Sequence, residues 1–357
     1  MRRVGELIVL ITLLTLIPKE LTAQKFLWNV GFRSAFDNRE YDNIKSSESG
    51  TLFGVSASPV VGIGFGEGHS IMTGGELTRH FGELSPKYHA DLLLYYHYDS
   101  DFFKAYAGIF PAMVRVGEYP LAFKGDDMFF EAPVQGALFS LSGKNSFAEL
   151  ACNWTGKIGN NQREKFQIWI YARSSLGFVY GALPFMMHHY ACSYQAGNVV
   201  DNIWIYPHIG FSFEKLLPVV DKMDLKFGWM KSFQNDRHMN EGYRNPGGFQ
   251  MEFDFRIIGI GISETFYKGS PMMPFYNRTG PDGIPYANDL YFGNLFYNSD
   301  AGIYNRIEIY YEPQISVKSL CDNHITFRIS SVHHYDGSGW GWQQKLSLRI
   351  ALLSKKR

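Results

Sequence analysis

Charged side chains that alternate with apolar ones are the residues of this chain best suited to chemistry. In the segment 248–256, Glu252, Asp254 and Arg256 share one face, while phenylalanine and methionine side chains occupy the other. The last segment, 341–353, repeats this pattern with lysine, serine and arginine opposite leucine and isoleucine. A face with both signs of charge can hold water and polar solutes, or can neutralise itself through salt bridges.

Extended over the whole chain, this alternation predicts an inward-facing set whose charges nearly balance. Its acidic members are Glu76, Asp91, Glu149, Glu214, Asp224, Glu252, Asp254, Glu308 and Glu312, and its basic members are Lys104, Arg173, Lys226, Arg256, Arg306, Arg328, Lys345 and Arg349. Nine acids against eight bases argue against strong selectivity for cations or for anions. Two interpretations stay open. The set lines a water-filled channel with a transverse field, or it forms a salt-bridge network that braces or plugs the interior.

Ser331 and His333 could supply the nucleophile and the base of a hydrolase, because they lie two residues apart on one face of the segment 322–335. We favour the other interpretation, a pair of polar residues near the membrane interface. The histidine pairs 188–189 and 333–334 are unsuited to a metal, since adjacent residues of a strand point to opposite faces. We therefore assign no catalytic residue, and we expect no metal and no cofactor.

The rhythm of the turns predicts the scaffold for these residues. Candidate strands cover 26–36, 51–65, 69–81, 87–98, 102–110, 134–142, 146–154, 165–173, 177–191, 202–214, 223–233, 248–256, 259–268, 304–313, 322–335 and 341–353. Tight turns at 66–68, 99–101, 143–145 and 174–176 alternate with long segments at 37–50, 111–133, 155–164, 192–201, 234–247 and 269–303. Short turns at one end and long loops at the other are typical of an outer-membrane β-barrel.

We therefore predict an all-β fold, a single transmembrane antiparallel up-and-down β-barrel of about 16 strands, within the range 14 to 18, with periplasmic termini. A soluble sandwich would show the same alternation with its apolar face inward. The length of the predicted strands and the charged residues in their middle favour a membrane barrel over a soluble sandwich. Aromatic residues at the predicted strand ends, such as Tyr95, Trp154 and Trp342, suit the two membrane interfaces.

The first 23 residues predict a cleavable secretory signal peptide, with Arg2 and Arg3 before an apolar run over 7–17 and a small-residue end at Ala23. Residues 24–357 would then form one barrel domain without a lipid anchor. The formal net charge is zero, from 34 basic and 34 acidic residues, which gives no nucleic-acid footprint. Three widely spaced cysteines predict no disulfide framework.

From Gln24 onward the chain resembles a Gram-negative outer-membrane barrel of porin-like size. The resemblance rests on architecture, and it implies insertion by the outer-membrane assembly machinery through the last strand. Such barrels usually finish on an aromatic residue, whereas this chain ends in Ser354-Lys355-Lys356-Arg357. Barrel lipases and lipid-A deacylases place a histidine and a serine two residues apart in the order His-x-Ser, whereas the order here is Ser-x-His.

The sequence thus predicts a porin-like channel or transporter component in the cell outer membrane, passing small polar solutes with weak ion selectivity. The alternative is a non-conducting barrel that acts as an outer-membrane lipid hydrolase or as a scaffold for a surface or secretion partner. The segments 111–133 and 269–303 could narrow the interior. The expected partners are outer-membrane lipid, small polar solutes and the assembly machinery, and the oligomeric state is left open.

Overall fold

The computed structural model describes residues 25–41, 44, 47–83, 88–125, 130–160, 162–191, 193–195, 197–214, 216–217, 219–315 and 322–354. The predicted signal peptide lies outside these residues, so cleavage after Ala23 stays a prediction. No helix within the described ranges is long and apolar enough to cross a membrane.

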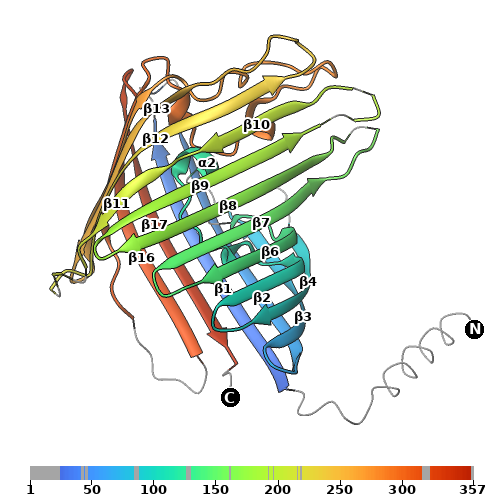
Figure 1. The fold of residues 1–357 in the computed structure, drawn as a ribbon, viewed down its shortest axis with the longest axis vertical. Helices are drawn as coiled ribbons and strands as arrows, with labels where there is room; N and C mark the ends of the chain where they lie inside the picture. Colours follow the sequence, from blue (N-terminus) through green and yellow to red (C-terminus); the bar gives the residue numbers. More distant parts are fainter. Residues whose placement is uncertain are drawn as a thin grey trace, which may run out of the picture.

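One antiparallel sheet closes on itself to form a barrel (Figure 1). Its strands are β1 (Lys25–Glu40), β2 (Gly50–Phe65), β3 (His69–His80), β4 (His89–Asp99), β5 (Phe103–Phe110), β6 (Val134–Ser142), β7 (Ser146–Gly156), β8 (Lys165–Leu176), β9 (Val179–Tyr190), β10 (Val200–Ile205), β11 (His208–Ser212), β12 (Lys222–Asp236), β13 (Gly247–Ile257), β14 (Ile260–Gly269), β15 (Ile303–Tyr311), β16 (Asp322–Tyr335) and β17 (Trp340–Leu353). Closure comes from β1, which pairs with both β2 and β17.

The barrel wall has sixteen strand positions, as predicted. Both β10 and β11 lie between β9 and β12, so they are two halves of one strand. The ladder is interrupted between Ile205 and His208, where Pro207 has no N–H to donate. The predicted strand 202–214 is therefore correct in position but broken in its middle.

The predicted turn at 174–176 is wrong. Strand β8 continues to Leu176, which pairs with Val179, and the turn consists of Gly177 and Phe178. Gly177 has a φ of +64°, a conformation that favours glycine over Ser174 or Ser175. Short turns at 66–68 and 143–145 occur where they were predicted.

The apolar face of the strands points outward. Ile262, Ile309 and Ile329 are exposed, whereas Gln250 and Gln343 are completely buried inside. A soluble sandwich would show the reverse. An exposed apolar belt around a mixed-charge interior is the arrangement of a membrane barrel.

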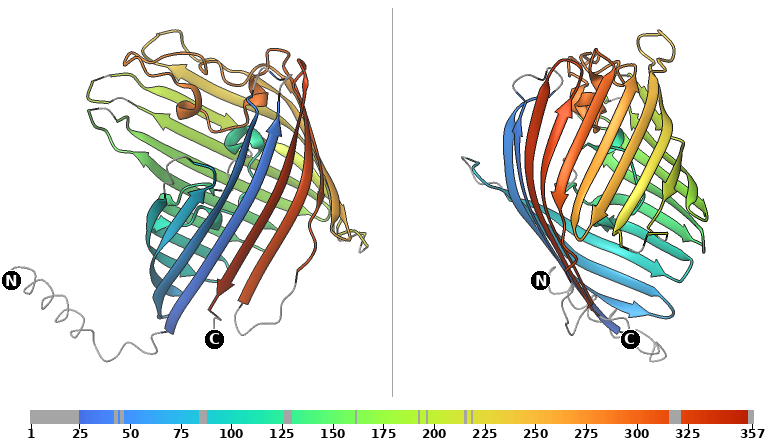
Figure 2. Two further views of the ribbon diagram at one scale, coloured as in Figure 1. Left: turned by 180° about the vertical axis from the view of Figure 1, so that it is seen from behind. Right: turned by 90° about the vertical axis from the view of Figure 1, so that its left-hand side faces the viewer.

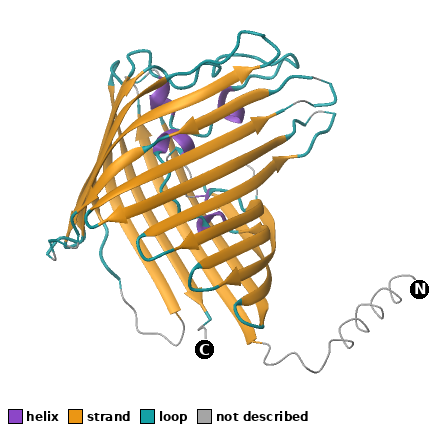
Figure 3. Cartoon of the chain, in the orientation of Figure 1, coloured by secondary structure: helices purple, strands orange, loops and turns teal. Residues whose placement is uncertain are grey.

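Two long segments fold into the barrel instead of leaving it (Figure 2). They are 270–302 and the described part of 111–133, which comprises residues 111–125 and 130–133. They carry the short helices η1 (Ala112–Val114), α2 (Leu121–Lys124), α3 (Ala287–Leu290) and η3 (Leu295–Asn298) (Figure 3). Phe123 of α2 is buried against Trp204 of the wall, with ring centroids 6.0 Å apart. Phe296 of η3 stacks on His334 at 4.5 Å. Both segments therefore narrow the interior by packing aromatic side chains against it.

Candidate functional site

Two cavities inside the barrel have walls of opposite charge. A cavity of about 240 Å³ is lined by acids that include Glu118, Glu214, Asp224, Glu252 and Asp254, with Arg173, Lys222 and Lys226. A neighbouring cavity of about 380 Å³ is lined by Lys124, Arg306, Arg328, Lys345 and Arg349, with Asp37, Glu252 and Glu308. Because Glu252 lines both, the two cavities are adjacent. The interior therefore runs from an acidic side, mainly on β12 and β13, to a basic side on β15 to β17.

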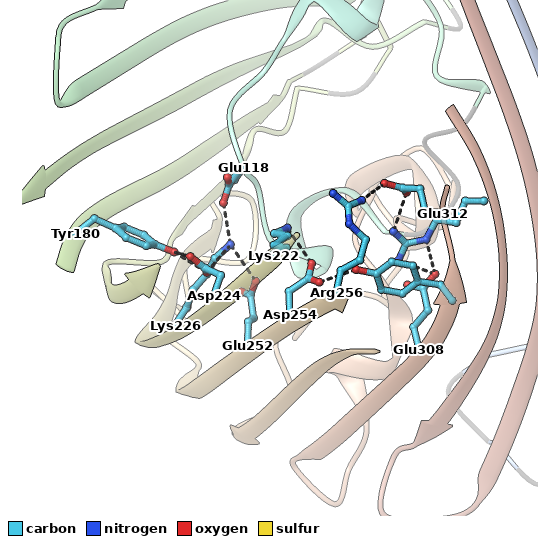
Figure 4. Close-up of polar contacts among 12 residues, drawn as sticks. Glu118, Tyr180, Lys222, Asp224, Lys226, Glu252, Asp254, Arg256, Glu308 and Glu312 are labelled. Carbon is cyan, nitrogen blue, oxygen red and sulfur yellow. Dashed lines mark hydrogen bonds and ion pairs between the residues drawn. The ribbon is translucent and has the colours of Figure 1, made fainter. Parts of the chain in front are cut away.

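Lys226 of β12 is the centre of the acidic side (Figure 4). Its Nζ lies 2.8 Å from Glu118 Oε2, 3.7 Å from Glu252 Oε2 and 4.0 Å from Asp224 Oδ1. Tyr180 donates its hydroxyl to Asp224 at 2.7 Å. Burial of Glu118 raises its pKa, but the charge and hydrogen bond of Lys226, with help from Arg173 and Lys222, outweigh this and lower the pKa to about 2. Since Glu118 belongs to the segment 111–133, this cluster ties that segment to the wall.

A ladder of arginine and glutamate residues crosses to the basic side (Figure 4). Glu312 accepts hydrogen bonds from Arg256 and from Arg328, the latter at 3.1 Å. Glu308 accepts from Arg328 and from Arg306, each at 3.0 Å. Every predicted interior residue of this group is therefore paired, which favours fixed side chains at the cavity wall.

Buried hydrogen bonds hold both long segments in place. Glu149 of β7 accepts from the backbone N–H groups of Val116 and Gly117 at 2.8 and 3.1 Å. Tyr297 donates to Gln250 at 2.9 Å, and Gln234 donates to the carbonyl of Met272 at 2.8 Å. These bonds make the segments part of the interior wall.

Three cavities meet at Lys124, the last residue of α2. The largest of these three, about 780 Å³, is lined by loop residues, among them Tyr276 and Asn288. The second is the basic cavity of about 380 Å³, and the third holds about 150 Å³. Lys124 lines all three, so the three cavities border one another at this side chain.

A second arrangement lies on the outer surface of β16. Ser331 Oγ and His333 Nε2 are 3.1 Å apart, within hydrogen-bonding distance, and His333 is exposed. The pair lies near the end of the strand, where Trp340 and Trp342 are also exposed. Asp336 is not an orienting group for this histidine, because it is buried and accepts hydrogen bonds from the turn residues Ser338 and Gly339.

Sequence reasoning missed other polar residues on the same face of the sheet as this pair. Glu264 accepts a hydrogen bond from Asn305 at 3.0 Å. In the ladder, Ile307 of β15 lies between Glu264 of β14 and His333 of β16. Gln344 of β17 pairs directly with Ser331. The sequence does mark Glu264 as unusual, because this acid interrupts the apolar face formed by Ile260, Ile262 and Phe266.

Comparison with known families adds one decisive observation. A family model described as "Lipid A 3'-O-deacylase-type" matches residues 19–352, nearly the whole chain. The chain belongs to this family. No curated protein matches it.

Solved structures similar to this family member include three proteins of Pseudomonas aeruginosa. OpdO has a TM-score of 0.54 and 10% identity, with 92% of this chain and 97% of that chain covered. OpdL and OccK5 (OpdH) each have a TM-score of 0.52 and 10% identity. The match to OpdL covers 92% of this chain and 98% of OpdL. The match to OccK5 covers 93% of this chain and 99% of OccK5. At this identity the likeness shows the fold alone, which is a porin-like barrel.

The remaining predicted interior residues of this family member occupy several environments. Glu76 is buried and paired with Arg33, which the sequence reasoning did not select. Asp91 lies opposite Glu76 in the ladder and is exposed. Lys104 lies 3.5 Å from Asp99. Glu149 is covered by the segment that it anchors, so it does not border open space.

The sequence predicts no metal site and no disulfide framework, and the structure describes only some of the residues that these two predictions concern. Within the described ranges, no three histidine, cysteine, aspartate or glutamate side chains are grouped as metal ligands. Cys152 is free, and Cys192 and Cys321 lie outside the described residues.

Proposed function

We propose that this protein is an outer-membrane channel for small polar solutes, narrowed by the segments 111–133 and 270–302. The observation that supports it most is the meeting of three interior cavities at Lys124, between walls of opposite charge. The smallest of them holds only about 150 Å³. Solutes that pass would therefore be small, and charged ones would be oriented by the opposed walls.

Removing the side chains of α2 is expected to raise the conductance. Replacing residues 121–124 with four glycines removes Phe123 from the interior and Lys124 from the junction of the cavities. Purified protein in planar lipid bilayers should show ohmic steps, and this variant should show steps at least about twofold larger.

The matched control replaces Met239 and Asn240, in the loop between β12 and β13, with glycine and keeps Glu241, which pairs with Arg278 of the segment 270–302. This change should leave the step size unaltered, because that loop does not line the cavities described here. Folded protein that gives no steps and takes up no solute in vesicles would contradict the channel.

A second candidate function is hydrolysis of an acyl ester of an outer-leaflet lipid. Family membership and the 3.1 Å contact between Ser331 and His333 favour it. Ser331 Oγ would attack the ester carbonyl while His333 Nε2 takes its proton, and the alcohol would leave with that proton. Water would then hydrolyse the acyl-serine and release the fatty acid. Gln344, opposite Ser331 in the ladder, would supply an amide donor for the oxyanion.

The Ser331→Ala variant is expected to abolish such an activity, with a loss of about a thousandfold or more. The measurement is the mass of lipid A extracted from membranes that contain the folded protein. Ser330→Ala is the matched control, because Ser330 is the preceding residue and faces the interior. Unaltered lipid A in the presence of the wild-type protein would rule this candidate out.

A further inference from the structure

Arg115 carries donor groups that the described part of the barrel leaves unused. It follows η1, and its side chain is only 5% exposed. One end of the guanidinium pairs with Glu131, and the group lies over the Trp169 ring at 4.7 Å. Its Nε and Nη1 atoms are buried and have no hydrogen-bond partner among the described residues. A buried donor without an acceptor is costly, so these two atoms indicate a missing acceptor.

Lys124 adds a second cation to the same cavity. Both side chains line the space of about 150 Å³, together with Arg33, Arg349 and one acid, Glu131. Lys124 forms no hydrogen bond or ion pair with a described residue. Burial and the neighbouring Arg115 lower the pKa of its ammonium group. Arg33 is neutralised by Glu76 and Arg115 shares Glu131, so positive charge exceeds negative charge at this point.

Most other cations of the interior have acids beside them. Elsewhere in the interior, Lys226 meets three acids, and Arg256 and Arg328 share Glu312. Isolated positive charge in a low-dielectric space is unfavourable unless an anion accompanies it.

We propose that this cavity binds a compact tetrahedral oxyanion, of the phosphate or sulfate class, between Arg115 and Lys124. Two donors of Arg115, which follows η1, and the ammonium of Lys124, at the end of α2, belong to side chains that line the same cavity, which suits an anion with several oxygens. A planar carboxylate offers fewer acceptors to such an arrangement. The site requires a folded barrel but no conduction, so it is testable apart from the proposed channel.

The test is isothermal titration of the full-length mature protein, folded in detergent, with inorganic phosphate. The paired variant Arg115→Gln/Lys124→Gln should bind at least about tenfold more weakly, because it loses both of the cations that would hold the anion. Lys104→Gln is the matched control, since Lys104 is half exposed and does not line the cavity. Acetate should bind more weakly than phosphate to the wild type.

The position of the bound anion is tested independently by soaking crystals of the protein in selenate. The anomalous peak should lie between Arg115 and Lys124. If the paired variant does not fold, as judged by its gel shift before and after boiling, Lys124→Gln alone takes its place.

Competition by dihexanoylphosphatidic acid would show that the bound group comes from a lipid. Absence of competition would show that the free ion is the ligand. No heat with phosphate, equal affinity in the variants, or a selenate peak elsewhere would overturn the proposal.

Discussion

Replacing Lys226 with methionine is expected to lower the free energy of unfolding by about 3 kcal/mol. The substitution keeps the length of the side chain but leaves Glu118, Asp224 and Glu252 without the cation that they share. Lys226 is 16% exposed, so water replaces its charge poorly. Urea unfolding in lipid vesicles, followed by the gel shift between folded and boiled protein, measures the loss.

Lys222→Met is the matched control. Lys222 lies on the same face of β12 but is 40% exposed, with Asp254 as its ion-pair partner at 2.8 Å. Exposed pairs contribute about 1 kcal/mol or less, so this variant should remain near the wild type. Adding Glu118→Gln to Lys226→Met should restore part of the stability. Equal losses for the two lysines would show that the Lys226 cluster does not carry the stability of this side of the barrel.

Leu348→Arg is expected to destabilise the barrel by about 2 to 4 kcal/mol, because an arginine in the middle of β17 would face lipid. Leu348 pairs with Ser34 and Phe327, at the centre of the seam where the barrel closes. The measurement is the yield and the unfolding free energy of the folded form in lipid vesicles of defined thickness.

Ser347→Arg tests the facing directly, since Ser347 is the adjacent residue and lines the interior cavity of about 380 Å³. An arginine at position 347 would meet water, so the loss of unfolding free energy should be smaller than for Leu348→Arg. If both variants fold with the same yield and stability, the assignment of faces along β17 is wrong.

The fold was predictable from the sequence because its determinants are local. Alternation with a period of two identifies each strand, and glycine pairs such as Gly66 and Gly68 mark the tight turns. Errors arose where a local pattern allowed two solutions. The serines at 174 and 175 suit a turn, but Gly177 accepts the positive φ that they resist. Pro207 breaks a strand whose alternation continues on both sides.

The candidate sites were less predictable, because they depend on which strands become neighbours and on how loops fold inward. The alternation places Lys226 and Glu252 on inward faces, but only the register brings them to 3.7 Å. Arg115 and Lys124 belong to a loop, for which no periodic pattern exists. Glu118 was likewise treated as a loop residue, although it joins that loop to the wall. The partnership of Glu264 with Asn305 required knowing that β14 and β15 are adjacent.

The pairing of the first and last strands has a consequence for biogenesis. Trp28 and Ser354 exchange hydrogen bonds across the seam, although 326 residues separate them in the chain. The ends of the polypeptide must therefore meet before the final ladder exists, and contacts between such distant segments form slowly. Until then, two unpaired strand edges and the apolar belt stay available for wrong association. Transit of this polypeptide to its membrane should accordingly need a holding chaperone, which shields those edges until the seam closes.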